Sequence, residues 1–300
     1  MSSTVPENRQ WQGTTYGNGW MHSSLVKVIK VLGLRLLYIF SLLFVVPVVF
    51  VVNPARRHIY RLMRRRLGYN VAKAVWKTYL NYCNFSKAVL DKFAMYAGKT
   101  FKLEIEGYQN FLDVAEKPEG FVQLSAHIGN YEIAGYTLVA KHKKFNAVVF
   151  AGEKGSVMAS RSKMFRGTNV TMIPAGQGSD YIFEISSALE RGETVSIAAD
   201  RVNGTPRTVT CEFLGAPAKF PAGPFSVAAM RSLDVIYVSV LKTSIRKYKV
   251  SVAPLSYDKE APRARQVEQL CRAYAARLQE EVRQNPCQWY NYFDFWADGN

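Results

Sequence analysis

The sequence FVQLSAHIGNYEIAGYTLVAKHKK, residues 121–144, decides the fold. Its apolar start predicts a short buried strand, and the residues from 131 onward predict a helix. Gly129 and Asn130 between them are residue types that permit a tight bend. This order puts His127 at the carboxyl end of a strand, the edge of an open α/β sheet where ligands collect. Because imidazole is the side chain best suited to accept a proton near neutral pH, His127 is a candidate general base.

Glu132 follows His127 with four residues between them. Positions five apart on an ideal helix are separated by about 140°, so the two side chains meet only if His127 precedes the helix and Glu132 lies within it. A carboxylate there would fix the tautomer of the imidazole. Spacing alone favours a surface or capping role, because a histidine and a glutamate five apart are common by chance. The motif therefore needs support from the rest of the chain.

The composition indicates a folded protein with an anionic partner. With 300 residues, the chain is long enough for one large α/β domain with an appendage, or for two small domains. Hydrophobic residues make up 48% and charged residues 21%, which argues against disorder. A net charge of +16 favours nucleic acid, anionic phospholipid or an acidic carrier protein as partner. We expect no nucleic-acid partner, because no helix-turn-helix, zinc-finger or aromatic RNA-recognition signature occurs.

The cysteines and histidines predict neither a disulfide frame nor a metal site. The four cysteines are scattered without paired spacing, which suits a reducing compartment: Cys83, Cys211, Cys271 and Cys287. Of the four histidines, His58, His127 and His142 are too dispersed for a metal site. We therefore expect no cofactor.

Residues 36–52, LLYIFSLLFVVPVVFVV, carry no charge and predict a membrane anchor. As a helix this run is roughly 25 Å long, slightly short of the ~30 Å hydrocarbon core, and Pro47 predicts a kink or a break. It can be a single marginal span or a re-entrant or interfacial anchor. A buried core helix would leave its basic flanks unexplained. The polar residues 1–23 before it do not resemble a removed signal peptide.

Basic residues flank the apolar run more heavily after it than before it. They are Lys27, Lys30 and Arg35 on one side, and Arg56, Arg57, Arg61, Arg64, Arg65 and Arg66 on the other. A spanning helix would therefore leave the rest of the chain in the cytoplasm, and the arginines suit anionic lipid. We divide the chain into residues 1–60, a polar segment with the anchor, and residues 61–300, an α/β domain.

Strands and helices alternate through the rest of the chain, which predicts an α/β fold with a mixed, mostly buried sheet flanked by helices. The expected strands are residues 101–107, 121–125, 146–150, 170–173, 194–198, 209–213, 235–241 and 248–253. The expected helices are residues 69–96, 108–115, 181–191 and 262–284, with another starting near Phe225 and a basic loop and helix over 153–167. The turn at residues 174–180 lacks the Gly-Lys-Ser/Thr ending of a nucleotide-binding loop.

Two further segments bear on a site. The strand at residues 194–198 delivers Asp200 and Arg201 to the same carboxyl edge as His127, either as a structural salt bridge or as part of a polar site. The aromatic tail at residues 289–296, WYNYFDFW, suits core packing or a membrane-interface belt, and we favour packing.

Four motifs in this order resemble the lysophospholipid acyltransferase-like superfamily, in its lipid A biosynthesis (lauroyl/myristoyl) acyltransferase branch. The first is HIGNYE at residues 127–132, similar to the family's histidine, four residues and an acid. The others are AADR at 198–201, FLGAPAKFPAGP at 213–224, and PCQW at 286–289, similar to a C-terminal Pro-x-x-Trp element. The resemblance covers most of the chain, including the N-terminal anchor.

The resemblance implies an acyltransferase of the bacterial inner membrane, with its catalytic domain on the cytoplasmic side. It would move a fatty acyl group from acyl-carrier protein or coenzyme A to a hydroxyl of a lipid or glycolipid. His127 would be the general base, and Glu132 would orient it and stabilise the imidazolium. The remaining implied site residues bind substrate or shape the site: Arg166, favoured over Arg161 for holding an anionic group, Asp200 and Arg201, and Glu153 as a weaker candidate.

The acceptor and two other function classes stay open. Glycerolipid acyltransferases of the superfamily carry an aspartate in the first motif and a Phe-Pro-Glu-Gly-Thr block. Here Glu132 and residues 220–224, FPAGP, differ from both, which favours a glycolipid or specialised polar lipid. The alternatives are a non-catalytic lipid-binding protein on the same fold and an acyl-thioester hydrolase. For the hydrolase no Gly-x-Ser-x-Gly elbow is present, and Ser125 lacks that frame.

Overall fold

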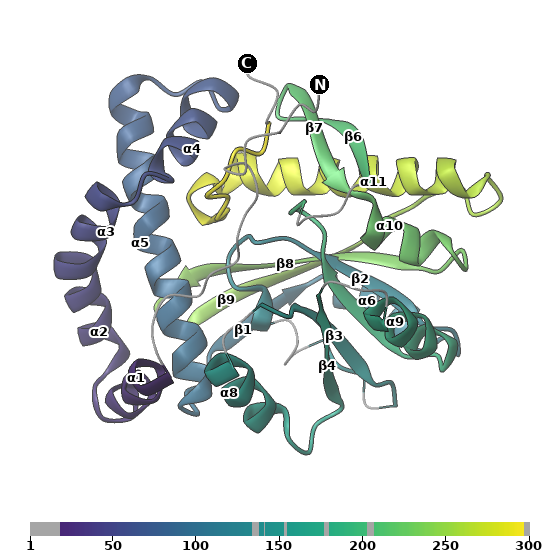
Figure 1. Cartoon of the computed structure of the whole chain (residues 1–300), viewed down its shortest axis with the longest axis horizontal. Helices are drawn as coiled ribbons and strands as arrows, with labels where there is room; N and C mark the ends of the chain where they lie inside the picture. Colours follow the sequence, from purple (N-terminus) through teal and green to yellow (C-terminus); the bar gives the residue numbers. More distant parts are fainter. Residues whose placement is uncertain are drawn as a thin grey trace, which may run out of the picture.

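A mixed seven-stranded sheet forms the centre of the computed structural model, which describes residues 19–133, 138–140, 142–152, 155–176, 180–202 and 207–296 (Figure 1). The strand order is β1-β9-β8-β2-β5-β3-β4, and every neighbouring pair is parallel except β8 and β9. The strands are β1 (Lys102–Glu106), β2 (Phe121–Ser125), β3 (Phe145–Phe150), β4 (Val170–Ala175), β5 (Thr194–Ala198), β8 (Val235–Ser244) and β9 (Lys247–Pro254). The predicted α/β fold with a mixed, buried sheet is confirmed.

Helices cover both faces of this sheet. On one face, α6 (Tyr108–Ala115) packs on the side chains of β1, β8 and β9 in one apolar cluster. On the other face lie α9 (Asp180–Glu190), α10 (Ala222–Ala229) and α11 (Arg263–Gln284), which share the largest apolar cluster with β2 and β5. The helices α5 (Val71–Tyr96) and α8 (Gly155–Phe165) lie beside the sheet (Figure 1). Most of these elements match the predicted ranges to within a few residues.

A small antiparallel hairpin lies apart from the main sheet and differs from the prediction. It pairs β6 (Thr208–Phe213) with β7 (Ala216–Pro221), and only β6 was predicted. The strand β7 contains Pro217 and Pro221, and because proline is rare within strands the sequence does not predict a strand there. A two-stranded ribbon tolerates them because each strand has a free edge that needs no N–H donor.

The helix predicted after Gly129 and Asn130 is not found in the described part of that segment. Tyr131–Ile133 form a single 3-10 turn, and residues 138–140 and 142–144 are irregular. Long-range contacts fix this conformation: Leu138 is buried in the cluster beneath α6. The ammonium of Lys143 donates to the carbonyls of Pro118, Glu119 and Gly192 at 2.8–3.3 Å. Such tertiary contacts override local helix propensity.

The apolar run forms a helix that continues through Pro47. It comprises α2 (Leu34–Phe40), a π-helical turn η2 (Ser41–Val45) and α3 (Val46–Val52). Proline removes one backbone donor, and the wider π turn just before it accommodates that loss. A preceding helix α1 (Gly19–Val31) and the following α4 (Arg56–Arg61) and η3 (Leu62–Arg66) complete the N-terminal region. Leu34–Val52 is long and apolar enough to cross a membrane.

The predicted division of the chain at residue 60 stays a prediction. Ile59, Met63 and Ala74, from α4, η3 and α5, share one small buried cluster. Packing between the N-terminal helices and α5 therefore continues across that position.

Candidate active site

Two parallel strands bring His127 and Asp200 to one edge of the sheet. All five residues of β2 are buried, and β2 pairs with β5 in the register Ser125 to Ala198. The backbone N–H of Ala199 extends the ladder by donating to the carbonyl of Ser125 at 2.9 Å. His127 and Asp200 each lie two residues beyond the paired ends. The predicted placement of both side chains at this edge is confirmed.

The chain leaves these two strands on opposite faces of the sheet. After β2, Ile133 and Leu138 join the cluster beneath α6. After β5, the hairpin β6–β7 and α10 join the cluster on the other face. Ligands bind at the carboxyl ends of the strands in open α/β sheets, and His127 and Asp200 lie at that edge.

The turn after His127 requires glycine at position 129. Gly129 has φ of +61°, and a Cβ there would lie 1.9 Å from the carbonyl oxygen of Val240. The turn is held on both sides, because the Gly129 N–H donates to Gln288 and the Asn130 N–H donates to Val240, each at 2.8 Å. The backbone around His127 is thus pinned to β8 and to the C-terminal segment.

His127 pairs with Asp200. Its Nδ1 lies 2.7 Å from Asp200 Oδ1, and its backbone N–H donates to Oδ2 at 2.9 Å. The indole Nε1–H of Trp289 donates to the same Oδ2 at 3.0 Å. An Nδ1 that donates to a carboxylate leaves Nε2 as the acceptor nitrogen of the ring. The His127 side chain is 20% exposed whereas that of Asp200 is 2% exposed, so only the imidazole faces the solvent side.

Burial and the Arg201 guanidinium lower the pKa of His127 below its ordinary 6.5, while Asp200 acts to raise it. Burial would raise the pKa of Asp200, but the partners His127, Arg201 and Trp289 together lower it to about 2. At neutral pH the pair is therefore a neutral imidazole beside an ionised carboxylate. That is the state a general base requires.

Glu132 lies in a separate cluster of cations. Its Oε1 accepts from the Lys92 ammonium at 2.5 Å and from Arg161 Nη2 at 2.7 Å, and its Oε2 accepts from the Tyr96 hydroxyl at 3.0 Å. Burial would raise the pKa of Glu132, but Lys92 and Arg161 outweigh it and lower the pKa to about 2. Among its described contacts His127 is absent, and the sequence-based pairing of His127 with Glu132 stays a prediction.

The other predicted residues are distributed around these two groups. Arg161 is buried on α8 against Glu132, whereas Arg166 is exposed in the turn after that helix. Arg201 Nη2 donates to the carbonyl of Tyr290 at 2.9 Å, close enough to Asp200 and His127 to influence their pKa values. Glu153 lies outside the described residues.

Sequence reasoning missed Lys92, Tyr96 and Tyr131. The first two lie on α5, far from the motif in sequence, and only the docking of that helix brings them to Glu132. The Tyr131 ring packs edge-on against the His127 imidazole, with 5.3 Å between centroids. The aromatic tail was predicted to pack, and this is confirmed, since Trp289 is fully buried.

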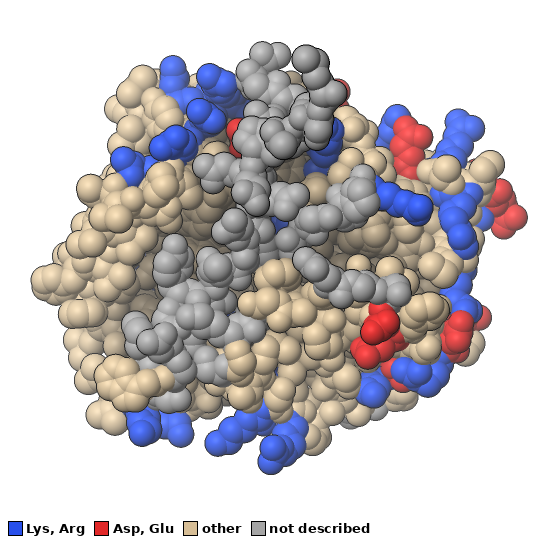
Figure 2. All heavy atoms as spheres, in the orientation of Figure 1, with Lys and Arg blue, Asp and Glu red and all other residues tan. Residues whose placement is uncertain are grey.

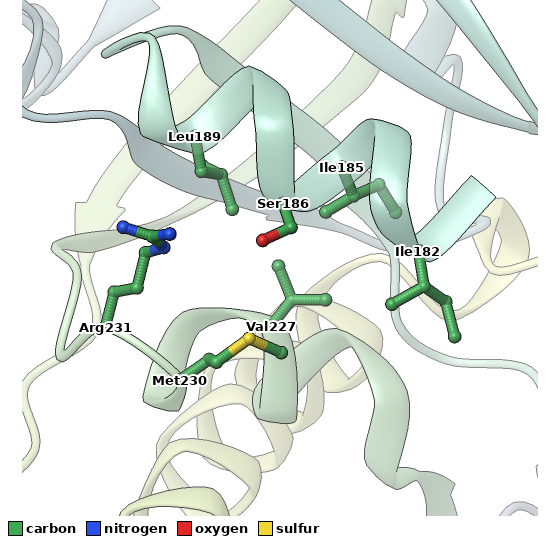
Figure 3. Close-up of a pocket in the computed structure, with 7 residues that line it drawn as sticks. All are labelled: Ile182, Ile185, Ser186, Leu189, Val227, Met230 and Arg231. Atoms are coloured by element: carbon green, nitrogen blue, oxygen red, sulfur yellow. The ribbon is translucent and has the colours of Figure 1, made fainter. Parts of the chain in front are cut away.

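Cavities found elsewhere in the described chain do not include these residues. A hollow of about 10 Å³ between α9 and α10 is lined by Ile182, Ile185, Ser186, Leu189, Val227, Met230 and Arg231 (Figure 3). A larger one, of about 310 Å³, includes Asp234 and Val235 at the start of β8, the edge opposite His127. Within the described ranges no group of three or more His, Cys, Asp or Glu could hold a metal ion.

Comparison with known proteins relates the chain to acyltransferases. Residues 92–296 match the family "Bacterial lipid A biosynthesis acyltransferase". No curated protein gives a significant match. Among solved structures, the chain is similar to the 1-acyl-sn-glycerophosphate (LPA) acyltransferase PlsC from Thermotoga maritima, with 15% identity, a TM-score of 0.40, and coverage of 89% of this chain and 100% of that one. The family match spans His127, Glu132, Asp200 and Trp289, and more than half of the chain. The protein therefore belongs to the bacterial lipid A biosynthesis acyltransferase family, whose members transfer an acyl group to a lipid acceptor.

Proposed function

We propose that the protein is an O-acyltransferase in which His127 is the general base, acting on a hydroxyl of a lipid or glycolipid at the cytoplasmic face of the inner membrane. The donor is an acyl thioester of acyl-carrier protein or coenzyme A. The observation that carries the proposal is the hydrogen bond of 2.7 Å between His127 Nδ1 and Asp200 at the carboxyl edge of the sheet.

In the proposed reaction, Nε2 of His127 takes the proton of the acceptor hydroxyl as its oxygen attacks the thioester carbonyl. The resulting tetrahedral intermediate collapses by breaking the carbon–sulfur bond. The thiolate then takes the proton from the imidazolium, so that ester and thiol are the products and His127 is neutral again. Asp200 holds the ring in the required tautomer and stabilises the imidazolium between the two steps. Because a thioester is already activated, the side chains of the protein suffice for these reaction steps.

Glu132 has a second role in this proposal, as a positioning residue for cations. Its carboxylate holds Lys92 and Arg161, two donors suited to an anionic group. Arg161, with Arg166 beyond it on the surface, would bind a phosphate of the donor or acceptor. The net charge of +16 supports an acidic carrier or a phosphate-bearing acceptor. If Glu132 instead orients His127, its loss will resemble the loss of Asp200.

The test compares lipids from cells that carry the wild-type protein, His127→Ala or His142→Ala. We expect a lipid species heavier by one acyl group in wild type and in the His142 control, whose imidazole Nε2 lies 2.8 Å from the carbonyl oxygen of Ala115. The His127 variant should lack that species while it remains folded in the membrane fraction. Substantial residual transfer by His127→Ala would overturn the assignment of the base. Free fatty acid without acylated lipid would favour a hydrolase.

A further inference from the structure

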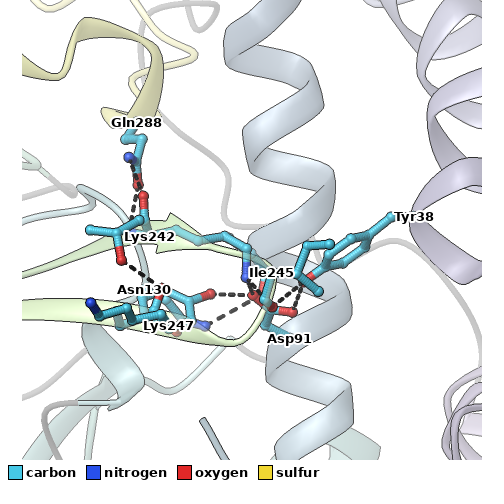
Figure 4. A network of polar contacts seen from close by, with 10 residues as sticks. Tyr38, Asp91, Asn130, Lys242, Ile245, Lys247 and Gln288 are labelled. Atoms are coloured by element: carbon cyan, nitrogen blue, oxygen red, sulfur yellow. Dashed lines mark hydrogen bonds and ion pairs between the residues drawn. The ribbon is translucent and has the colours of Figure 1, made fainter. Parts of the chain in front are cut away.

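A buried charged cluster fastens the apolar helix to the catalytic domain (Figure 4). The carboxylate of Asp91, on α5, is fully buried. It accepts hydrogen bonds from the hydroxyls of Tyr38 on α2 and Tyr248 on β9, and from the ammonium of Lys242 on β8 at 2.5 Å. One carboxylate thus joins the apolar helix, α5 and the central sheet.

Aromatic rings enclose the ammonium of this cluster. Lys242 Nζ lies 4.6 Å from the ring centroid of Tyr248 and 5.3 Å from those of Tyr38 and Phe101, all within cation–π range. The Lys242 side chain is 12% exposed. Separation of Tyr38 from this site would open one wall of the enclosure and remove a donor from a buried carboxylate, which is costly.

The apolar helix packs against α5 along its whole length. Near its start, Leu37 and Tyr38 share a cluster with Phe93 on α5. Near its end, Val46 shares a cluster with Tyr82 and Cys83. The same α5 is bonded to the C-terminal segment, where Asn81 donates to the carbonyl of Trp289 at 2.8 Å. The helix is therefore one layer of the catalytic domain.

The opposite face of this helix is apolar and exposed. Its outward residues are 54–74% exposed: Leu36, Ile39, Phe40, Leu43, Phe44, Val48, Val51 and Val52. Exposed Val71, Val75 and Trp76 at the start of α5 add to this apolar surface. A row of exposed apolar side chains along one helix face marks an interaction site.

The charges around this face identify its partner. No Asp or Glu occurs between Glu7 and Asp91. The basic residues of the described part of that interval are Lys27, Lys30, Arg35, Arg56, Arg57, Arg61, Arg64, Arg65, Arg66, Lys73, Lys77 and Lys87. In Figure 2 the apolar edge that α2 and α3 form is bordered by Lys and Arg at its upper and lower ends. An apolar face with basic borders fits anionic phospholipid.

We propose that the outward face of Leu34–Val52 is a membrane-docking surface that lies flat in one leaflet of the bilayer, with the helix parallel to the membrane plane. A spanning helix must be surrounded by hydrocarbon or by other apolar helices. Here α5 occupies the inner face and carries Lys73, Lys77 and Lys87, and the polar catalytic domain lies behind it. The 19 residues would reach about 28 Å, so length alone permits a span, and the fastening to α5 and the sheet argues against it.

The first experiment locates the two ends of the helix relative to the membrane. This inference rests on the proposed location at the cytoplasmic face. Lys30→Cys and Arg57→Cys, at exposed positions on either side of Leu34–Val52, are treated separately with a membrane-impermeant maleimide. We expect both to react in inverted inner-membrane vesicles and neither in intact spheroplasts, above the background of the wild-type cysteines. Reaction of the two on opposite sides would overturn the flat arrangement.

A second experiment tests the face itself with matched substitutions. Phe44→Glu adds a charge to the outward face, and Phe183→Glu makes the same change on α9, where the ring is 69% exposed. We expect at least a tenfold loss of binding to vesicles of anionic phospholipid for the first variant only. Equal binding by both would overturn the proposed surface. Acyl transfer is measured on the same vesicles, so a protein that is inactive but labels as expected contradicts the proposed function and leaves the docking mode standing.

Discussion

Two buried aspartates, Asp200 and Asp91, hold different parts of the protein together in different ways. Asp200 accepts N–H donors from a backbone amide, an imidazole and an indole, and its pKa falls to about 2. Asp91 accepts from two phenols and an ammonium, and burial raises its pKa above the ordinary 3.8 although Lys242 acts to lower it. Burial also lowers the pKa of Lys242.

The difference lies in what each carboxylate faces. The partner of Asp200 is a partly exposed imidazole that can meet a substrate, so a carboxylate kept ionised can stabilise charge that develops there. The partners of Asp91 are enclosed by rings and by three elements of the fold. We infer that the first site is built for a change of charge and the second for attachment, although both are buried polar clusters.

The largest expected effect is at Asp200. Asp200→Asn removes the acceptor that holds the Nδ1–H tautomer of His127, and we expect acyl transfer to fall about 10³–10⁴-fold. The measurement is kcat for thioester-dependent acylation of the lipid acceptor, with folding checked by thermal unfolding. Transfer within tenfold of wild type would contradict the contrast between the two aspartates.

Asp91 should affect stability rather than chemistry. Asp91→Leu leaves Lys242 buried without its ion partner, and we expect a loss of about 3–5 kcal/mol in the free energy of unfolding. The double variant Asp91→Leu with Lys242→Met should recover much of that loss, because no charge is then left unpaired. Denaturant titration measures both. Glu104→Gln, which removes an exposed partner of Lys247, is the control and should change stability little.

The sequence predicted one of these two sites much better than the other. Buried strands that end in His127 and in Asp200-Arg201 follow from local patterns, and parallel pairing then brings them to one edge. The hydrogen bond that joins His127 and Asp200 depends on tertiary structure and cannot be read from sequence spacing. Glu132, which is nearer in the sequence, was therefore predicted as the partner of His127. Asp91, Lys242 and Tyr248 come from three elements distant in the chain, and none has a motif around it.

The errors in secondary structure have similar causes. In the described residues 138–140 and 142–144, Leu138 packs in the core beneath α6 and Lys143 donates to distant carbonyls, so these residues do not continue the predicted helix. The strand β7 carries two prolines, and its pairing with β6 is what makes it a strand. By contrast α6 and α11, whose apolar faces repeat regularly, were predicted almost to the residue.

A substitution at Glu132 distinguishes two roles for this residue: it holds the two cations, or it orients His127. Glu132→Gln removes the carboxylate that holds Lys92 and Arg161. We expect kcat/KM to fall roughly 10–100-fold, mainly because KM for the donor rises. The pH at which the rate falls on the acid side of the pH–rate profile should not change, because His127 still has Asp200 as its partner. A fall in kcat as large as that of Asp200→Asn, with KM unchanged, would instead favour Glu132 as the partner of His127.

The smallest effects lie in the pH dependence of stability, where the two aspartates should act with opposite sign. The folded-state pKa of Asp200 is depressed from 3.8 to about 2, so its contribution of about 2 kcal/mol is present above pH 4 and is lost as the pH falls toward 2. The folded-state pKa of Asp91 is raised, so the cost of its ionisation disappears on acidification. Denaturant titrations between pH 5 and 2.5 measure how the free energy of unfolding falls on acidification. Compared with wild type, this fall should be shallower in Asp200→Asn and steeper in Asp91→Asn. Identical slopes in the two variants would contradict the assigned pKa directions.

Residues 288–290 complete the site around His127. Trp289 donates to Asp200, Gln288 accepts from Gly129, and the Tyr290 N–H donates to the carbonyl of His127 at 2.9 Å. During synthesis the N-terminal helices leave the ribosome well before these residues do. The apolar helix is therefore synthesised before the residues that hold His127 and Asp200, and we expect a polypeptide that stops short of residue 289 to keep that helix but to lack acyltransferase activity.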